Sequence, residues 1–225
     1  MAIIIGDNRT EYADIIGEVL KTAWTYYDHN DALIYSWHGE VFLNGHPLYD
    51  AEHGGRGNID CSTLVHLVLQ GIPYDKSPYA TGDTEDFFRS DCPWADRKIR
   101  KKLKEYPPLR KSNELARYYV GKGQSFSGEG LQPGDLVFFQ APEKSRAKYI
   151  EKGAFMAISH VGIVAEDPKY MIHCSGTSNK ENDLAEGKGA VRYTRIYGRR
   201  SPILFVRPCF KIFSDDRRKR VSNDR

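Results

Sequence analysis

The sequence lacks several features that would identify a class of protein directly. Its four cysteines, at positions 61, 92, 174 and 209, have neither the paired spacing of a zinc site nor the density of a disulfide framework. A reducing compartment, or a fold indifferent to disulfides, is the simplest interpretation. We expect no metal and no cofactor.

Long apolar runs and a strong net charge are also missing. No stretch approaches the ~20 apolar residues of a membrane span, and the formal net charge is only +3. The basic clusters at 98–111 and 217–220 are typical of solvated surface, and no nucleic-acid-binding motif is recognisable. We therefore expect neither a membrane span nor a nucleic-acid partner, and the oligomeric state stays open.

The first residues do not resemble a signal peptide. Met-Ala-Ile-Ile-Ile-Gly-Asp-Asn-Arg has no basic region and no long apolar core. The expectation is a cytoplasmic protein, unless a route other than a standard signal exports it.

What the sequence does contain is a change of pattern near residue 131. Helical spacing dominates before it, in 11–27 and 58–70, and a short hairpin is expected from 33–37 and 40–43. Five strands are predicted after it, at 135–139, 158–165, 170–175, 190–196 and 203–207. Helices followed by an antiparallel sheet of roughly five strands predict an α+β fold.

We expect one domain over residues 1–210. Residues 1–46 would supply its first helix and the hairpin, and 74–108 would be an insertion that covers one side. Residues 211–225 form a charged tail.

The segment 58–70 places a thiol at the start of a buried helix. Asp60 is a good N-cap residue, so Cys61 falls at the first helical position, and Gly71 ends the helix. Unpaired N–H groups and the helix dipole favour the thiolate there, and the thiolate is the nucleophile. Cys61 is thus a candidate nucleophile. The alternative is a small buried hydrophobic residue, as most free cysteines are.

A predicted hairpin supplies two histidines. If its turn is centred on Glu166 and Asp167, His160 pairs directly with His173 across the ladder. A catalytic thiol needs a base and a group that orients the base, and the two imidazoles offer both. Gly162 leaves open space beside His160 for a backbone or a substrate.

A metal site is the other chemistry open to these residues. Its ligands would be Cys61, His160, His173 and possibly Cys174. Cys174, however, should point to the opposite face of its strand from His173, which argues against such a site.

Four segments, in this order, resemble the NlpC/P60 family of papain-like cysteine peptidases. They are Asp60-Cys61-Ser62, Leu131-Gln-Pro-Gly-Asp-Leu-Val-Phe-Phe139, Ser159-His-Val-Gly-Ile-Val164 and Met171-Ile-His173. Tyr49, twelve positions before Cys61, stands where the family tends to have a tyrosine that lines the site. The resemblance covers about residues 47–207.

The resemblance implies a papain-like fold and a thiol hydrolase. Cys61 would be the nucleophile, His160 the general base and later the acid, and His173 the group that orients His160. The implied reaction is hydrolysis of amide bonds in bacterial cell-wall stem peptides or their recycled fragments, typically after D-glutamate.

The same resemblance implies a pocket around the thiol. The backbone N–H of Cys61, with Tyr49, would stabilise the oxyanion, and Asp60 and Ser62 would hold the amino end of the substrate. Thr63 departs from the pattern, because the family usually has a glycine there.

Two other functions stay open at this stage. Related papain-like folds perform amidase or acyl-transfer chemistry on substrates other than peptidoglycan, for example as delivered effectors, through the same thioester. An apolar channel lined by 74–108 would favour acyl transfer. A misaligned Cys-His-His set would instead favour a non-catalytic binding module.

Overall fold

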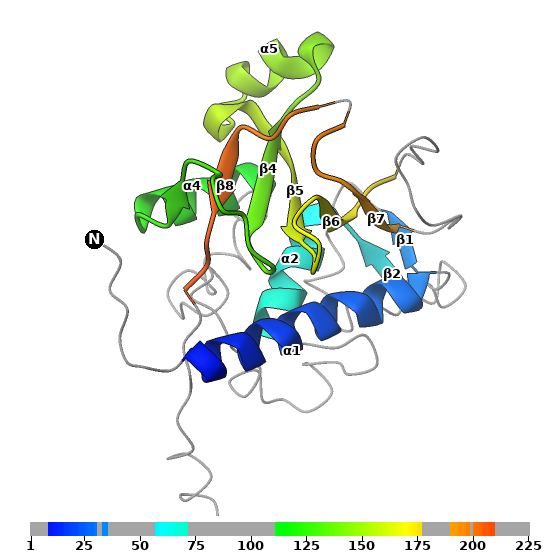
Figure 1. Ribbon diagram of the computed structural model, residues 1–225. Coiled ribbons are helices and arrows are strands. Elements are labelled where there is room, and N and C mark those ends of the chain that lie inside the picture. Colours follow the sequence, from blue (N-terminus) through cyan, green and yellow to red (C-terminus); the bar gives the residue numbers. More distant parts are fainter. Residues whose placement is uncertain are drawn as a thin grey trace, which may run out of the picture.

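The computed structural model of the protein describes residues 9–30, 33–35, 57–71, 111–176, 190–198 and 200–209 (Figure 1). The segments 40–43, 74–108 and 211–225, for which the sequence made predictions, lie outside these ranges.

The described residues form helices and strands in a mixed order, with most of the strands after residue 131 as the sequence predicts. The helices are α1 (Arg9–Asp28), α2 (Cys61–Gln70), α4 (Ser112–Gly121), α5 (Glu143–Glu151) and the short 3-10 helix η6 (Phe155–Ala157). The strands are β1 (Leu33–Tyr35), β2 (Gly57–Ile59), β3 (Ser125–Phe126), β4 (Leu136–Gln140), β5 (Ile158–Val164), β6 (Tyr170–Cys174), β7 (Val191–Arg195) and β8 (Leu204–Val206). Contrary to the predicted order, β1 and β2 come before α2, and α5 and η6 lie between β4 and β5.

Six strands make one antiparallel sheet in the order β3-β8-β4-β5-β6-β7. The α+β class is therefore confirmed. The extra strand is β3, only two residues long, which is too short for a sequence period to reveal. Of the described helices, none is both long and apolar enough to cross a membrane.

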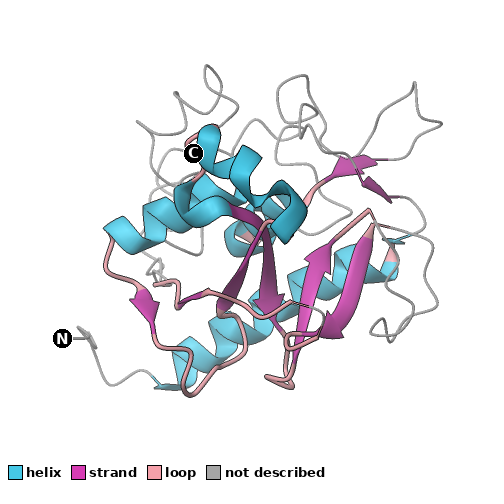
Figure 2. Cartoon of the chain, turned by 90° about the horizontal axis from the view of Figure 1, so that it is seen from above, coloured by secondary structure: helices cyan, strands magenta, loops and turns pink. Residues whose placement is uncertain are grey.

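β1 and β2 form a separate, parallel pair, in which Tyr35 lies opposite Ile59 (Figure 2). The hairpin predicted between 33–37 and 40–43 stays a prediction, because 40–43 lies outside the described residues. The pairing with β2 brings β1 to the residues that directly precede α2.

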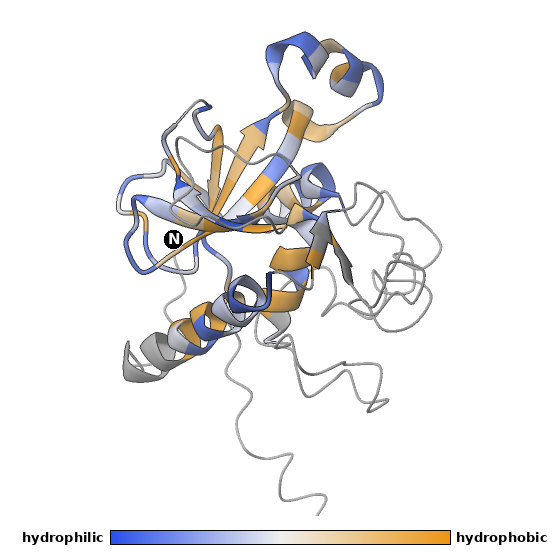
Figure 3. Cartoon of the chain, turned by 90° about the vertical axis from the view of Figure 1, so that its right-hand side faces the viewer, coloured by the Kyte–Doolittle hydropathy of each residue, from blue (hydrophilic) through white to orange (hydrophobic). Residues whose placement is uncertain are grey.

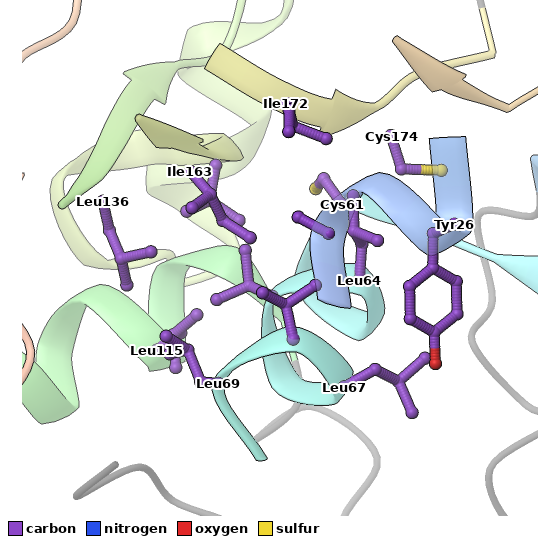
Figure 4. Close-up of a cluster of buried hydrophobic side chains, with 14 of the residues drawn as sticks. Tyr26, Cys61, Leu64, Leu67, Leu69, Leu115, Leu136, Ile163, Ile172 and Cys174 are labelled. Atoms are coloured by element: carbon purple, nitrogen blue, oxygen red, sulfur yellow. The ribbon is translucent and has the colours of Figure 1, made fainter. Parts of the chain in front are cut away.

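The main core lies between the sheet and the helices. α2 packs against β5 and β6, and α1 and α4 pack against α2. Figure 4 shows Leu64 and Leu67 of α2 among the side chains of this core, which also include Ile163 of β5 and Ile172 of β6. Every residue of α2 from Cys61 to Leu69 is buried, which explains why its sequence is apolar nearly all round.

Both predicted caps of α2 are present. The Asp60 side chain accepts a hydrogen bond from the Thr63 N–H at 2.7 Å. Gly71 has a φ of 70°, the left-handed conformation that glycine adopts at a helix C-terminus. These caps fix where the helix begins, and hence the place of the thiol.

The β5–β6 hairpin has a different register from the predicted one. Gly162, and not His160, pairs with His173. The Ala165 N–H donates to the Tyr170 carbonyl at 3.0 Å, so the turn is centred one residue further along the chain than predicted. That displacement moves the register by two residues, and the two histidines therefore stay on the same face as diagonal neighbours.

The space beside Gly162 is filled by protein. A Cβ atom at Gly162 would lie 2.6 Å from Met171 Sδ and 3.3 Å from His173 Cβ. Of the two predicted uses of this space, the structure supports the approach of a neighbouring strand and not that of a substrate.

We expect Gly162→Ala to lower the free energy of unfolding by about 1–3 kcal/mol, because the added methyl group overpacks β5 against β6. Gly121→Ala is the matched control, since no atom lies within 4 Å of a Cβ built at that helical position. Urea unfolding measures both. Equal stability of the two variants would contradict the packing described.

Candidate active site

The Cys61 thiol lies at the N-terminus of α2, against β5. The residue is 6% exposed. The backbone N–H groups of Val161, Ser62 and Cys61 itself lie close enough to its sulfur to lower the pKa of the thiol. Val161 directly follows His160, so this contact places the thiol beside the strand that carries the predicted base.

Burial governs the acidity of this thiol. It raises the pKa of Cys61 to about 12, and the Asp60 carboxylate is the second cause, while the backbone N–H groups lower the pKa by less. The thiolate expected from the position at the helix N-terminus is therefore not the resting form. Desolvation outweighs the dipole and the hydrogen bonds.

Three side chains form one hydrogen-bonded row across the neighbouring strands β5, β6 and β7, the first two of which pack against the helix that carries the thiol. His160 Nε2 lies 2.8 Å from His173 Nδ1, and His173 Nε2 lies 3.0 Å from Thr194 Oγ1. The two imidazole rings meet edge to face, with centroids 4.8 Å apart. The predicted contact between the histidines is present, and Thr194 of β7 is an addition that the sequence did not reveal.

The remaining ring nitrogen of His160 is Nδ1. In the part of the chain that the structure describes, no hydrogen bond joins this imidazole directly to the Cys61 sulfur. The two residues are related through β5, because the Val161 N–H that acts on the thiol directly follows His160. In free enzymes, catalytic hydrogen bonds are often long or poorly aligned and tighten only when substrate binds.

Both histidines are held in the neutral form. Burial lowers the pKa of His160 to about 3, and the Arg200 guanidinium is the second cause. Burial also lowers the pKa of His173 well below its usual range, followed by the charges of His160, Arg192 and Arg200. A neutral imidazole is the form that can accept a proton.

Asp60 and Ser62 are engaged in the cap of α2. The same Asp60 oxygen that accepts from the Thr63 N–H also accepts from the Ser62 hydroxyl, at 2.8 Å. This arrangement accounts for Thr63 in place of glycine, because the cap uses only its backbone N–H. The predicted contacts of Asp60 and Ser62 with a substrate stay predictions.

Two tyrosines that the sequence analysis did not single out lie near the thiol. Burial raises the pKa of Tyr35, on β1, and of Tyr149, on α5, and in each case the charge of Cys61 is the second cause. Tyr35 reaches the site because β1 pairs with β2, a long-range contact with no local signal. Tyr49, the predicted tyrosine, lies outside the described residues.

No group of three or more histidine, cysteine or acidic side chains in the described ranges could hold a metal ion. No protein-family model matches the chain, and no curated protein matches it in sequence.

The lowered pKa values of the two histidines predict a loss of stability in acid. The unfolded chain binds protons below about pH 6.5, whereas His160 in the folded chain does so only near pH 3. The free energy of unfolding should therefore fall between these values, by at most about 1.4 kcal/mol per pH unit for each histidine.

Urea unfolding at a series of pH values measures this loss. His160→Gln should have a shallower acid limb than the wild type, because it removes a group whose pKa is lowered in the folded chain. An identical acid limb in His160→Gln would contradict the neutral imidazole.

Proposed function

We propose that this chain is a papain-like cysteine peptidase that hydrolyses amide bonds in bacterial cell-wall stem peptides. The observation that supports it best is the row His160–His173–Thr194 in the sheet against which α2, with the thiol at its N-terminus, packs. The order of the four motifs, as in the NlpC/P60 family, supports the substrate class.

The hydrogen bonds are compatible with one arrangement of protons that prepares a base. With a proton on Nε2 of each ring, His160 donates to His173 Nδ1, and His173 donates to the Thr194 hydroxyl oxygen. His160 Nδ1 then carries a lone pair. Thr194 and His173 thus act as positioning residues that fix the tautomer of His160.

In this proposal, the reaction begins with a neutral Cys61 thiol and a neutral His160 imidazole. The Cys61 sulfur attacks the carbonyl carbon of the amide while its proton passes to His160 Nδ1. The C–N bond then breaks, and the leaving amine takes this proton. Water hydrolyses the resulting thioester, with His160 again as the base, and the free thiol and neutral imidazole return.

The negative oxygen of the tetrahedral intermediate needs donors that stay protonated. Tyr35 and Tyr149 meet this requirement, because the pKa of each phenol is raised. One of them, together with the Cys61 backbone N–H, would support the oxyanion in this proposal, beside Tyr49, for which the resemblance implies the same role.

Digestion of soluble stem peptides and of purified peptidoglycan tests the proposal, with the products identified by mass. The wild type should release new fragments, and Cys61→Ala should release none. Cys209→Ala is the matched control, since this thiol is exposed, and it should cut as the wild type does. If the wild type leaves all these substrates intact, the peptidase proposal is wrong and amidase or acyl transfer takes its place.

We expect Thr194→Val to lower kcat by about tenfold with KM little changed, because loss of the hydroxyl frees His173 to adopt the wrong tautomer. Thr194→Ser, which keeps the hydroxyl, should recover most of the rate. Full activity in Thr194→Val would show that the hydroxyl does not position the imidazoles.

A further inference from the structure

After β4, the segment 142–157, which contains α5 and η6, lies beside the site and contributes little to the core. We call this segment the wall. α5 has no buried residue, and only Ser145 and Tyr149, one turn apart, are half-buried. Figure 3 shows this helix at the top, largely hydrophilic and apart from the apolar strands. Packing therefore does not explain why a helix stands there.

The segment after α5 is strained. Met156 and Ala157 have φ values of 50° and 52°, in the left-handed region that residues other than glycine rarely adopt. The end of β4 holds them, since the Gln140 side chain donates to the Met156 carbonyl at 3.1 Å and the Ala141 N–H donates to the Ala157 carbonyl at 2.8 Å. Such strain is concentrated at functional sites.

Arg200 is anchored to the same end of β4. Its Nη1 donates to the Gln140 carbonyl at 3.0 Å. Phe139, the residue before Gln140, pairs with His160, so the guanidinium is held close to the imidazole pair. Its charge correspondingly lowers the pKa of His160, His173 and Tyr149.

The Arg200 guanidinium has more N–H groups than its hydrogen bond to the Gln140 carbonyl uses. A guanidinium carries five N–H groups, and Arg200 is exposed. No acidic side chain among the described residues forms an ion pair with it. The large apolar side chains that the described residues expose, Ile150, Met156 and Tyr197, belong to this wall and to the loop that carries Arg200.

We propose that Arg200, with the Tyr149 hydroxyl beside it, binds a carboxylate that the substrate carries next to the scissile amide. A fixed guanidinium is the side chain best matched to a carboxylate, which it can hold through two parallel hydrogen bonds. The assignment of the scissile amide rests on the function proposed above, whereas the anion subsite beside Cys61 does not.

A carboxylate at this place also assists the proton transfer. Arg200 disfavours a positive charge on His160. A bound anion offsets the guanidinium charge, so His160 accepts the Cys61 proton more readily in the complex than in the free protein. Substrates without the carboxylate should therefore lose kcat as well as affinity.

Two alkylating reagents test the subsite without any substrate. Iodoacetate and iodoacetamide both add to the Cys61 sulfur and release iodide, and they differ in the carboxylate. We expect the ratio of their rates at Cys61 to fall about tenfold in Arg200→Gln relative to the wild type, because a charge-assisted contact is lost. Tyr149→Phe should lower the ratio by less.

Arg195→Gln is the matched control. This exposed arginine of β7 lies against the Tyr170 ring of β6 and not at the site. Its ratio should equal that of the wild type. A ratio that is the same in Arg200→Gln, Arg195→Gln and the wild type would overturn the subsite.

A pair of stem peptides tests the role in the reaction. One has a free α-carboxylate on D-glutamate, and the other has a carboxamide there. The wild type should prefer the first, and Arg200→Gln should lose this preference. If both peptides are cut equally by both proteins, the subsite is wrong while the peptidase stands. If neither is cut but the reagent ratio depends on Arg200, the peptidase is wrong while the subsite stands.

Discussion

Desolvation of the thiol and the two imidazoles is the constraint on which the site depends. Cys61 is part of the main core, and His160 and His173 are packed between neighbouring strands. Removing ionisable groups from water penalises their charged forms, which raises the pKa of a thiol and lowers that of an imidazole. The site therefore rests with no charge on any of the three groups.

Because the thiol and the two imidazoles are neutral, the main contribution of the fold is to orient these three groups. The hydrogen bonds from His160 to His173 and from His173 to Thr194 align three strands that are neighbours in the sheet, β5, β6 and β7. Since no ion pair is formed in advance, the charge separation occurs only when the substrate is attacked. Groups that stabilise charge at that moment, such as protonated tyrosines and an anchored guanidinium, then decide the rate.

Local patterns allowed much of this fold to be predicted from the sequence. The caps of α2, the β4, β5 and β6 strands and the contact between the two histidine side chains follow from residue types that act over a few positions. The register of the β5–β6 hairpin could not be predicted in this way, because it depends on which residue lies at the centre of the turn. Tyr35 and Thr194 reach the site through strand pairing, and Arg200 reaches it through its hydrogen bond to the Gln140 carbonyl, so no local signal marked these residues. The direction of the Cys61 pKa shift depends on burial, which the sequence around Cys61 does not show.

The pH dependence of Cys61 alkylation by iodoacetamide tests the central claim most directly. A buried, neutral thiol beside a neutral imidazole predicts a rate that rises about tenfold per pH unit from pH 6 to pH 10, without a plateau, because the thiolate fraction rises in that way below a pKa of about 12. A rate that is already high near pH 5 and level above it would mean a preformed thiolate–imidazolium pair. That result would contradict the account.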